Sequence, residues 1–100
     1  MAYWSVLGKP NNGGRTFGVT LDTDKKTWVV GGPDYGDTFK TKSGPYVVKP
    51  APALETVLMG SGNKVVANFR NLHGGSSKGD TGSGHQQETA IDFKWTLDSK

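Results

Sequence analysis

Apolar and polar residues alternate over short runs of this chain, most clearly near its end. In the run 88–97, the side chains on one side are large and apolar: Ile91, Phe93, Trp95 and Leu97. The residues between them are small, polar or charged. A period of two is typical of a strand with one buried face. The pattern therefore predicts a closing strand whose apolar side, Trp95 included, packs in the core.

The same period of two recurs earlier in the chain, between short segments rich in turn-forming residues. It predicts a first strand over 3–7 and then three hairpins. The predicted arms are 15–21 with 27–30, 38–42 with 46–49 around the turn 43–45, and 56–59 with 64–70 around the turn 60–63. In the last arm, Val65, Ala67 and Phe69 are expected to face the core and Val66 the other side.

The stretch 71–87 does not alternate. It contains five glycines and only one large apolar residue, Leu72. Such a segment buries too little surface to offset the entropy lost on ordering. We therefore predict a long Gly/Ser-rich loop within the domain, and a loop of this length in a compact domain is often functional.

These elements together predict an all-β protein. No window repeats apolar residues with the helical period over three turns, and 100 residues suit one domain over 1–100. Seven or eight strands joined by hairpins are typical of an antiparallel β-sandwich or a small β-barrel. We expect one of these two architectures.

Composition limits what holds the fold together. The chain has no cysteine, and hydrophobic residues make up 33% of it, so a thin core must stabilise the fold without disulfides. The first residues lack the basic leader and apolar stretch of a secretory signal. On these grounds the chain is expected to be a soluble protein, cytoplasmic as synthesised.

The net charge of +3 is unevenly distributed. Segment 38–70 carries five basic residues against Glu55 alone, and aromatic residues lie among them. Proteins that bind single-stranded nucleic acid combine a positive surface with aromatic side chains on which bases stack. One hypothesis is therefore a nucleic-acid-binding β domain that uses Lys40, Lys42, Lys49, Lys64 and Arg70.

The loops suggest a different ligand. Planar amides and carboxylates can hydrogen-bond the hydroxyls of a sugar, while an aromatic ring covers its apolar C–H face. Tyr35 between Asp34 and Asp37 has this composition, and Trp4 or Trp28 could supply a further ring. We therefore favour a non-catalytic, lectin-like carbohydrate-binding module. Its predicted ligand-binding residues are Asn11, Asn12, Arg15, Asp34, Tyr35, Asp37 and His85.

Catalysis and metal binding are weakly indicated. Residues 75–79 match G-x-S-x-G, and Asp80 and His85 follow Ser77 in the order of a hydrolase triad. A nucleophile elbow, however, needs a rigid strand-to-helix turn, and all three residues fall in the predicted loop. His73 and His85, with Asp80 between them, are better read as solvated than as metal ligands. We expect no catalytic residues, no metal and no cofactor.

A third hypothesis is structural. Open β-sheets expose edge strands that can pair with a neighbouring chain. A virion or coat subunit, or another homo-oligomer, could assemble in this way.

Overall fold

Eight antiparallel strands follow one another around a closed barrel, and the last strand pairs with the first. The architecture comes from a computed structural model, which describes residues 2–32 and 38–100. The strands are β1 (Tyr3–Pro10), β2 (Phe17–Asp22), β3 (Thr27–Gly31), β4 (Ser43–Lys49), β5 (Glu55–Met59), β6 (Val65–Arg70), β7 (Thr81–Gln86) and β8 (Ile91–Ser99). The described residues contain no α-helix, only a 3-10 turn, η2 (Ser61–Asn63). The predicted all-β class is confirmed, and the architecture is the barrel.

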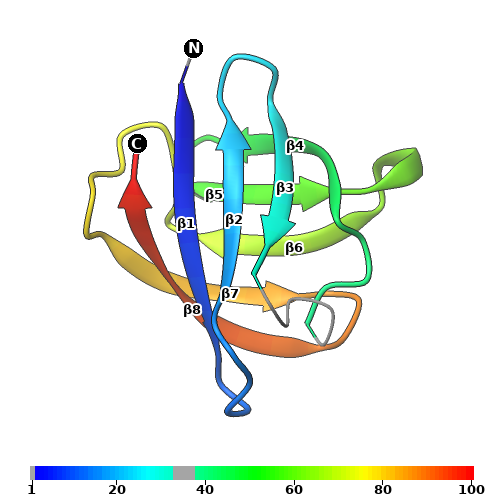
Figure 1. Cartoon of the computed structure of the whole chain (residues 1–100). Coiled ribbons are helices and arrows are strands. Elements are labelled where there is room, and N and C mark those ends of the chain that lie inside the picture. Colours follow the sequence, from blue (N-terminus) through cyan, green and yellow to red (C-terminus); the bar gives the residue numbers. More distant parts are fainter. Residues whose placement is uncertain (1, 33–37) are drawn as a thin grey trace.

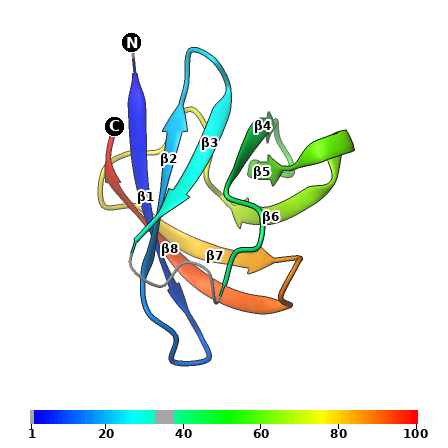
Figure 2. The ribbon, with the colours of Figure 1, turned by 45° about the vertical axis from the view of Figure 1, so that its right-hand side comes forward.

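The strands wrap around a common axis, with β1, β2 and β3 on one side and β4, β5 and β6 on the opposite side (Figures 1 and 2). Both termini lie at the same end of the barrel (Figure 1). Because each strand pairs with a neighbour on both sides, the inward side chains of all eight meet in one core.

Aromatic rings fill the bore of the barrel. Phe17 packs edge-on against Phe39 and Phe93, with ring centres 4.9 and 5.2 Å apart, and Phe93 packs against Phe69 at 5.0 Å. The buried side chains of β2 and β8 are those that the alternation predicted, except that Ile91 is only half-buried. An eight-stranded barrel is just wide enough to be filled in this way, so its interior is a core.

The glycines of the predicted loop 71–87 lie partly in a strand, so the loop prediction was wrong over β7. A Cβ atom added to Gly82 would lie 2.6 Å from the indole nitrogen of Trp95. One added to Gly84 would lie 2.3 Å from the ring of Phe93. Both rings belong to β8, the neighbouring strand. Glycine is therefore needed here to leave room for large side chains in a small barrel.

The second predicted hairpin is also wrong. Residues 38–42 form no strand, and β4 continues through the expected turn 43–45. Pro45 pairs with Thr27 of β3, and a Cβ atom at Gly44 would lie 2.0 Å from the carbonyl oxygen of Met59. The Gly-Pro pair therefore marks a close approach of two backbones rather than a turn.

The first and third hairpins are confirmed, with one change of face. Leu58 pairs with Ala67 and Met59 with Val65, so Val66 is an extra residue in β6. This bulge buries both Val66 and Ala67 and leaves Val65 exposed. The predicted inward position of Val65 and outward position of Val66 are therefore reversed.

Candidate functional site

The two ends of the barrel differ in how they are closed. One end, here called the mouth, carries the β2–β3 turn, the β4–β5 and β6–β7 connections and both termini. The opposite end, here called the plugged end, carries the β1–β2 connection, residues 38–42, η2 and the β7–β8 turn. A ligand that enters along the barrel axis must use one of these ends.

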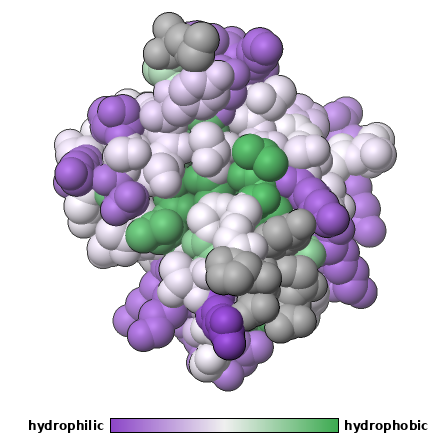
Figure 3. Space-filling model, in the orientation of Figure 1, coloured by the Kyte–Doolittle hydropathy of each residue, from purple (hydrophilic) through white to green (hydrophobic). Residues whose placement is uncertain are grey.

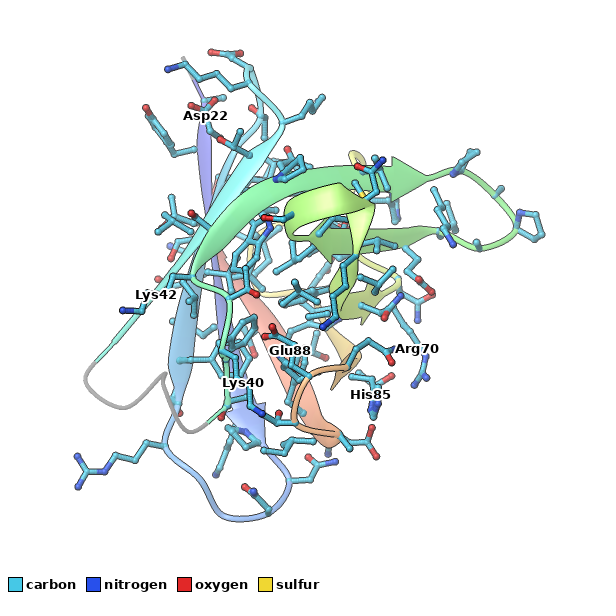
Figure 4. All side chains as sticks on the ribbon, turned by 90° about the vertical axis from the view of Figure 1, so that its right-hand side faces the viewer. Asp22, Lys40, Lys42, Arg70, His85 and Glu88 are labelled. Carbon is cyan, nitrogen blue, oxygen red and sulfur yellow. The ribbon has the colours of Figure 1, made fainter. Side chains whose placement is uncertain are left out.

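A loop residue closes the plugged end. Phe39 is only 1% exposed and packs against Phe17 and Trp28. The carboxylate of Glu88, in the β7–β8 turn, holds this segment in place. It accepts hydrogen bonds from the backbone N–H groups of Lys40 and Thr41 at 3.0 Å each and from the Thr41 hydroxyl at 2.7 Å. Figure 4 shows Lys40 and Glu88 side by side.

A buried amide completes this set of hydrogen bonds, which we call the Glu88 clamp. Gln86 is fully buried, and its Nε2 donates to Glu88 Oε1 at 2.9 Å. Its Oε1 accepts from the backbone N–H groups of Glu88 and Thr89 at 2.5 and 3.2 Å. The Thr89 hydroxyl donates to the carbonyl of Thr38 at 2.9 Å. These polar groups are paired with one another, so they stabilise the closure rather than await a ligand.

The hydrogen bonds to Glu88 change its acidity. Burial by itself raises the pKa of this carboxyl, but the hydrogen bonds from Thr41, Gln86 and Lys40 outweigh burial and lower the pKa from 4.5 to about 2. Donors that stabilise the ionised form have this effect. Glu88 is therefore an anion at neutral pH. Its charge holds residues 38–42, here called the plug, against the end of the barrel.

The mouth, by contrast, contains a cavity of about 160 Å³. Its walls come from five strands or turns and from the β6–β7 connection. The lining residues are Trp4, Leu21, Thr23, Lys26, Tyr46, Val48, Thr56, His73 and Gly74. Aromatic and aliphatic walls with a few polar groups at the rim are typical of small-molecule sites, and barrel mouths are a common place for them.

Two aromatic side chains form part of the mouth. Tyr46 is almost fully buried, and burial together with the nearby charge of Asp22 raises the pKa of its phenol. The hydroxyl therefore stays neutral at physiological pH and can both donate and accept a hydrogen bond. Trp4 is half-buried against the core, and the ammonium group of Lys100 lies 4.9 Å from its ring centre.

The β6–β7 connection presents His73 to the mouth. Leu72, which is buried, anchors this connection, and its carbonyl accepts a hydrogen bond from the Thr56 hydroxyl at 2.7 Å. The backbone N–H of Gly75 donates to Nδ1 of His73 at 3.0 Å. In the neutral imidazole the proton is then on Nε2, which makes Nε2 a hydrogen-bond donor.

The residues predicted to bind a sugar lie elsewhere. Asn11, Asn12 and Arg15 belong to the β1–β2 connection at the plugged end. The side chain of Asn12 accepts from the N–H of Gly14 at 2.9 Å and so stabilises its own turn. Asp34, Tyr35 and Asp37 lie outside the described residues.

The structure brings Asn11 and His85 near each other. The N–H of Asn11 donates to the carbonyl of Asp92 at 2.8 Å, and Nδ1 of His85 lies 2.7 Å from a carboxylate oxygen of Asp92. Neither residue lines the mouth cavity. Binding by these residues stays a prediction, at a site separate from the mouth.

Outward polar residues of β5 to β8 interact with one another. Asn68 donates to Glu55 at 2.6 Å and accepts from the side chain of Gln87 at 2.9 Å. Arg70 lies 3.4 Å from the Ser83 hydroxyl, on the same side of the molecule as His85 (Figure 4). These pairs follow from strand register, and they stabilise the outer wall modestly.

The basic residues of segment 38–70 do not lie together. Lys40 and Lys64 lie near the plugged end, whereas Lys49 and Arg70 are at the mouth ends of β4 and β6. Glu55 pairs with both Lys49 and Arg70 across the sheet, so an acidic residue separates these two cations. Lys42 points away from Arg70 (Figure 4). Phe39 and Phe69, moreover, are buried. Nucleic-acid binding stays a prediction, with less support from this arrangement.

Ser77, Asp80 and His85 do not form a relay. The Asp80 carboxylate accepts from the backbone N–H of Ser77 at 2.8 Å and closes a turn, while His85 contacts Asp92 instead. Over residues 2–32 and 38–100, no three His, Asp or Glu side chains are grouped so that they could hold a metal ion. Within the same residues, no helix has the length and hydropathy required to cross a membrane.

Sequence reasoning missed most of the mouth. Only Trp4 had been considered as a ligand surface, and Trp28, the other candidate, is buried with its indole N–H donating to Met59. The mouth residues are separated by up to 70 positions, and only the closure of the barrel brings them together. No local pattern in the sequence places Trp4 and Tyr46 at the same end of the barrel. Comparison with known proteins found no matching family model, curated protein or solved structure.

Proposed function

We propose that this protein is a non-catalytic binding module that takes a single sugar unit, or a similar small polyhydroxylated ligand, at the mouth of the barrel. One observation carries the proposal. The mouth has a cavity of about 160 Å³ in which the aromatic residues Trp4 and Tyr46 meet hydrogen-bonding groups. The opposite end is closed by Phe39 and the Glu88 clamp.

The chemistry of the cavity suits a sugar. Sugar hydroxyls need donors and acceptors, and the mouth offers the Tyr46 phenol, Nε2 of His73, the ammonium of Lys26 and the hydroxyl of Thr23. The apolar C–H face of a sugar needs apolar walls, which Leu21, Val48 and the two aromatic rings supply. The volume admits one ring rather than an oligosaccharide inside the cavity.

The cavity is also suited to binding without large rearrangement. The β6–β7 connection is held by Leu72 in the core, by the bond from Thr56, and by the Ser76 side chain, which accepts from the N–H of His73 at 3.1 Å. A wall that is ordered before the ligand arrives lowers the entropic cost of binding.

Isothermal titration calorimetry with a panel of neutral monosaccharides tests the proposal. At least one sugar should bind, and Tyr46→Phe and Lys26→Gly should each weaken it by about tenfold, the usual effect of losing one hydrogen bond. Glycine is used at Lys26 because φ there is +58°.

The matched controls are Asn12→Ala and His85→Ala, which remove predicted ligand residues away from the mouth. Both should leave the affinity unchanged. If the controls abolish binding and the mouth variants do not, sugar binding belongs to the other site and the mouth proposal is wrong. If no sugar binds at millimolar concentration, the proposed ligand class is wrong.

A further inference from the structure

The outer side of β1, β2 and β3 exposes apolar side chains. Tyr3 and Val29 are each 50% exposed, and Leu7 is 37% exposed. On strands β1 and β3 these three side chains point outward, on either side of Thr20 in β2. Figure 3 shows apolar residues gathered in the middle of this side, with hydrophilic residues around them. We call this surface the β1–β3 face.

The β1–β3 face is hollowed on both sides of a central pair. Thr20 and Val29 pair across β2 and β3, and both line two shallow hollows of about 550 and 420 Å³. Tyr3 lines the first hollow and Leu7 the second. The same surface thus offers a projection, Val29, and recesses next to it.

Charged side chains are scarce among the described residues that line the two hollows. Among the described residues that line the two hollows, Asp22 is the only charged one, although the chain has 12 basic and 9 acidic residues. A neutral surface gives no attraction to nucleic acid or to an anionic membrane. It also gives no like-charge repulsion against an identical surface, and depletion of charge is typical of the core of a protein–protein interface.

We propose that the β1–β3 face binds a second copy of this chain, in a symmetric dimer. A twofold dimer needs a patch that is complementary to itself, and a surface with an apolar projection beside apolar hollows meets this need. Val29 of each copy enters a hollow of the other.

Such a dimer needs only a limited part of the surface. A stable interface of standard size buries about 800 Å² on each partner, roughly a seventh of the 5490 Å² of accessible surface of this chain. The β1–β3 face spans three of the eight strands of the barrel wall. Each of the eight described strands pairs with a neighbour on both sides, so assembly through edge strands stays a prediction with less support from this closed barrel.

Sedimentation velocity between about 1 µM and 1 mM tests the proposal. The unmodified protein should shift from monomer to dimer as its concentration rises. Val29→Asp should raise the dissociation constant about 100-fold or more, because it places two like charges in an apolar interface. Thr20→Lys should also raise the dissociation constant, because Thr20 is an exposed residue of the same face.

Val47→Asp is the matched control, because Val47 is similarly exposed, at 43%, but lies on β4 outside both hollows. It should dimerise like the unmodified protein. Circular dichroism melting should show that all three variants remain folded. A protein that stays monomeric over the whole range, or one that Val47→Asp disrupts as strongly as Val29→Asp, overturns the proposal.

Discussion

The two ends of this barrel are closed in different ways. At the plugged end, the ring of Phe39 enters the core and a carboxylate fixes the backbone behind it. At the mouth, aromatic and polar side chains stop short of one another and leave a cavity. The difference teaches that a filled bore does not rule out a binding site. The plugged end stabilises the fold, and the cavity at the mouth is where we propose that a ligand binds.

The largest expected effect comes from removing the plug. Phe39→Ala should lower the free energy of unfolding by about 3–5 kcal/mol, because it deletes a fully buried aromatic ring that touches Phe17 and Trp28. Urea unfolding followed by fluorescence measures this loss. Val48→Ala, at the partly exposed mouth, is the control and should cost less than about 1 kcal/mol. Equal losses of unfolding free energy in Phe39→Ala and Val48→Ala would show that the two ends contribute equally to stability, contrary to this account.

The next effect comes from the clamp. Glu88→Gln keeps the size of the side chain but replaces a charged acceptor of four hydrogen bonds with a neutral amide. We expect a loss of about 1–3 kcal/mol in urea unfolding. Asp98→Asn, on exposed β8 surface, removes the same charge and should change stability by less than about 0.5 kcal/mol. If Asp98→Asn costs as much, the effect is one of net charge and not of the clamp.

Acid should weaken the same clamp. The folded-state pKa of Glu88 is about 2, below its ordinary value of 4.5. Its contribution to stability is therefore fully present above about pH 4.5 and is lost as the pH falls toward 2. Urea unfolding at a series of pH values from 6 to 2 should show a decline that is smaller in Glu88→Gln. Parallel declines in the two proteins would show that ionisation of Glu88 does not contribute to the stability of the folded protein.

The smallest effect is expected at the mouth. Lys100 lies over the ring of Trp4 and donates to the carbonyl of Ser76 at 2.5 Å. Lys100→Ala should cost at most about 1 kcal/mol, as expected for a cation–π contact near solvent. Thermal melting measures the change, with Lys94→Ala on the exposed side of β8 as the control. A loss as large as that of Phe39→Ala would mean that the mouth is a structural closure too.

Much of the barrel was predictable because strand patterns are local. The alternation of Phe17, Val19 and Leu21, and of Phe93, Trp95 and Leu97, depends only on neighbouring residues and is confirmed. The strand β7 was missed because its glycines are explained by rings on β8, not by their own neighbours in the sequence. A composition rule that equates glycine with loops fails where a narrow barrel needs space.

The candidate site was less predictable than the fold. Its residues come from β1, β2, the β2–β3 turn, β4, β5 and the β6–β7 connection. Register and closure, which no local pattern specifies, decide which of them meet. The role of Phe39 was hidden for the same reason. It lies in a segment that forms no strand, and long-range hydrogen bonds, such as those to Glu88 and from Thr89, hold that segment against the barrel.

Chemical-shift mapping tests the central claim most directly. In a ¹⁵N-labelled sample titrated with monosaccharides, the indole N–H of Trp4 and the amides of Lys26, His73 and Gly74 should move together and saturate. The amides of Asn11, Asn12 and Gln87, away from the mouth, should not move. Saturable shifts confined to the plugged end, or no shifts with any sugar, would contradict the account of the mouth as a sugar-binding site.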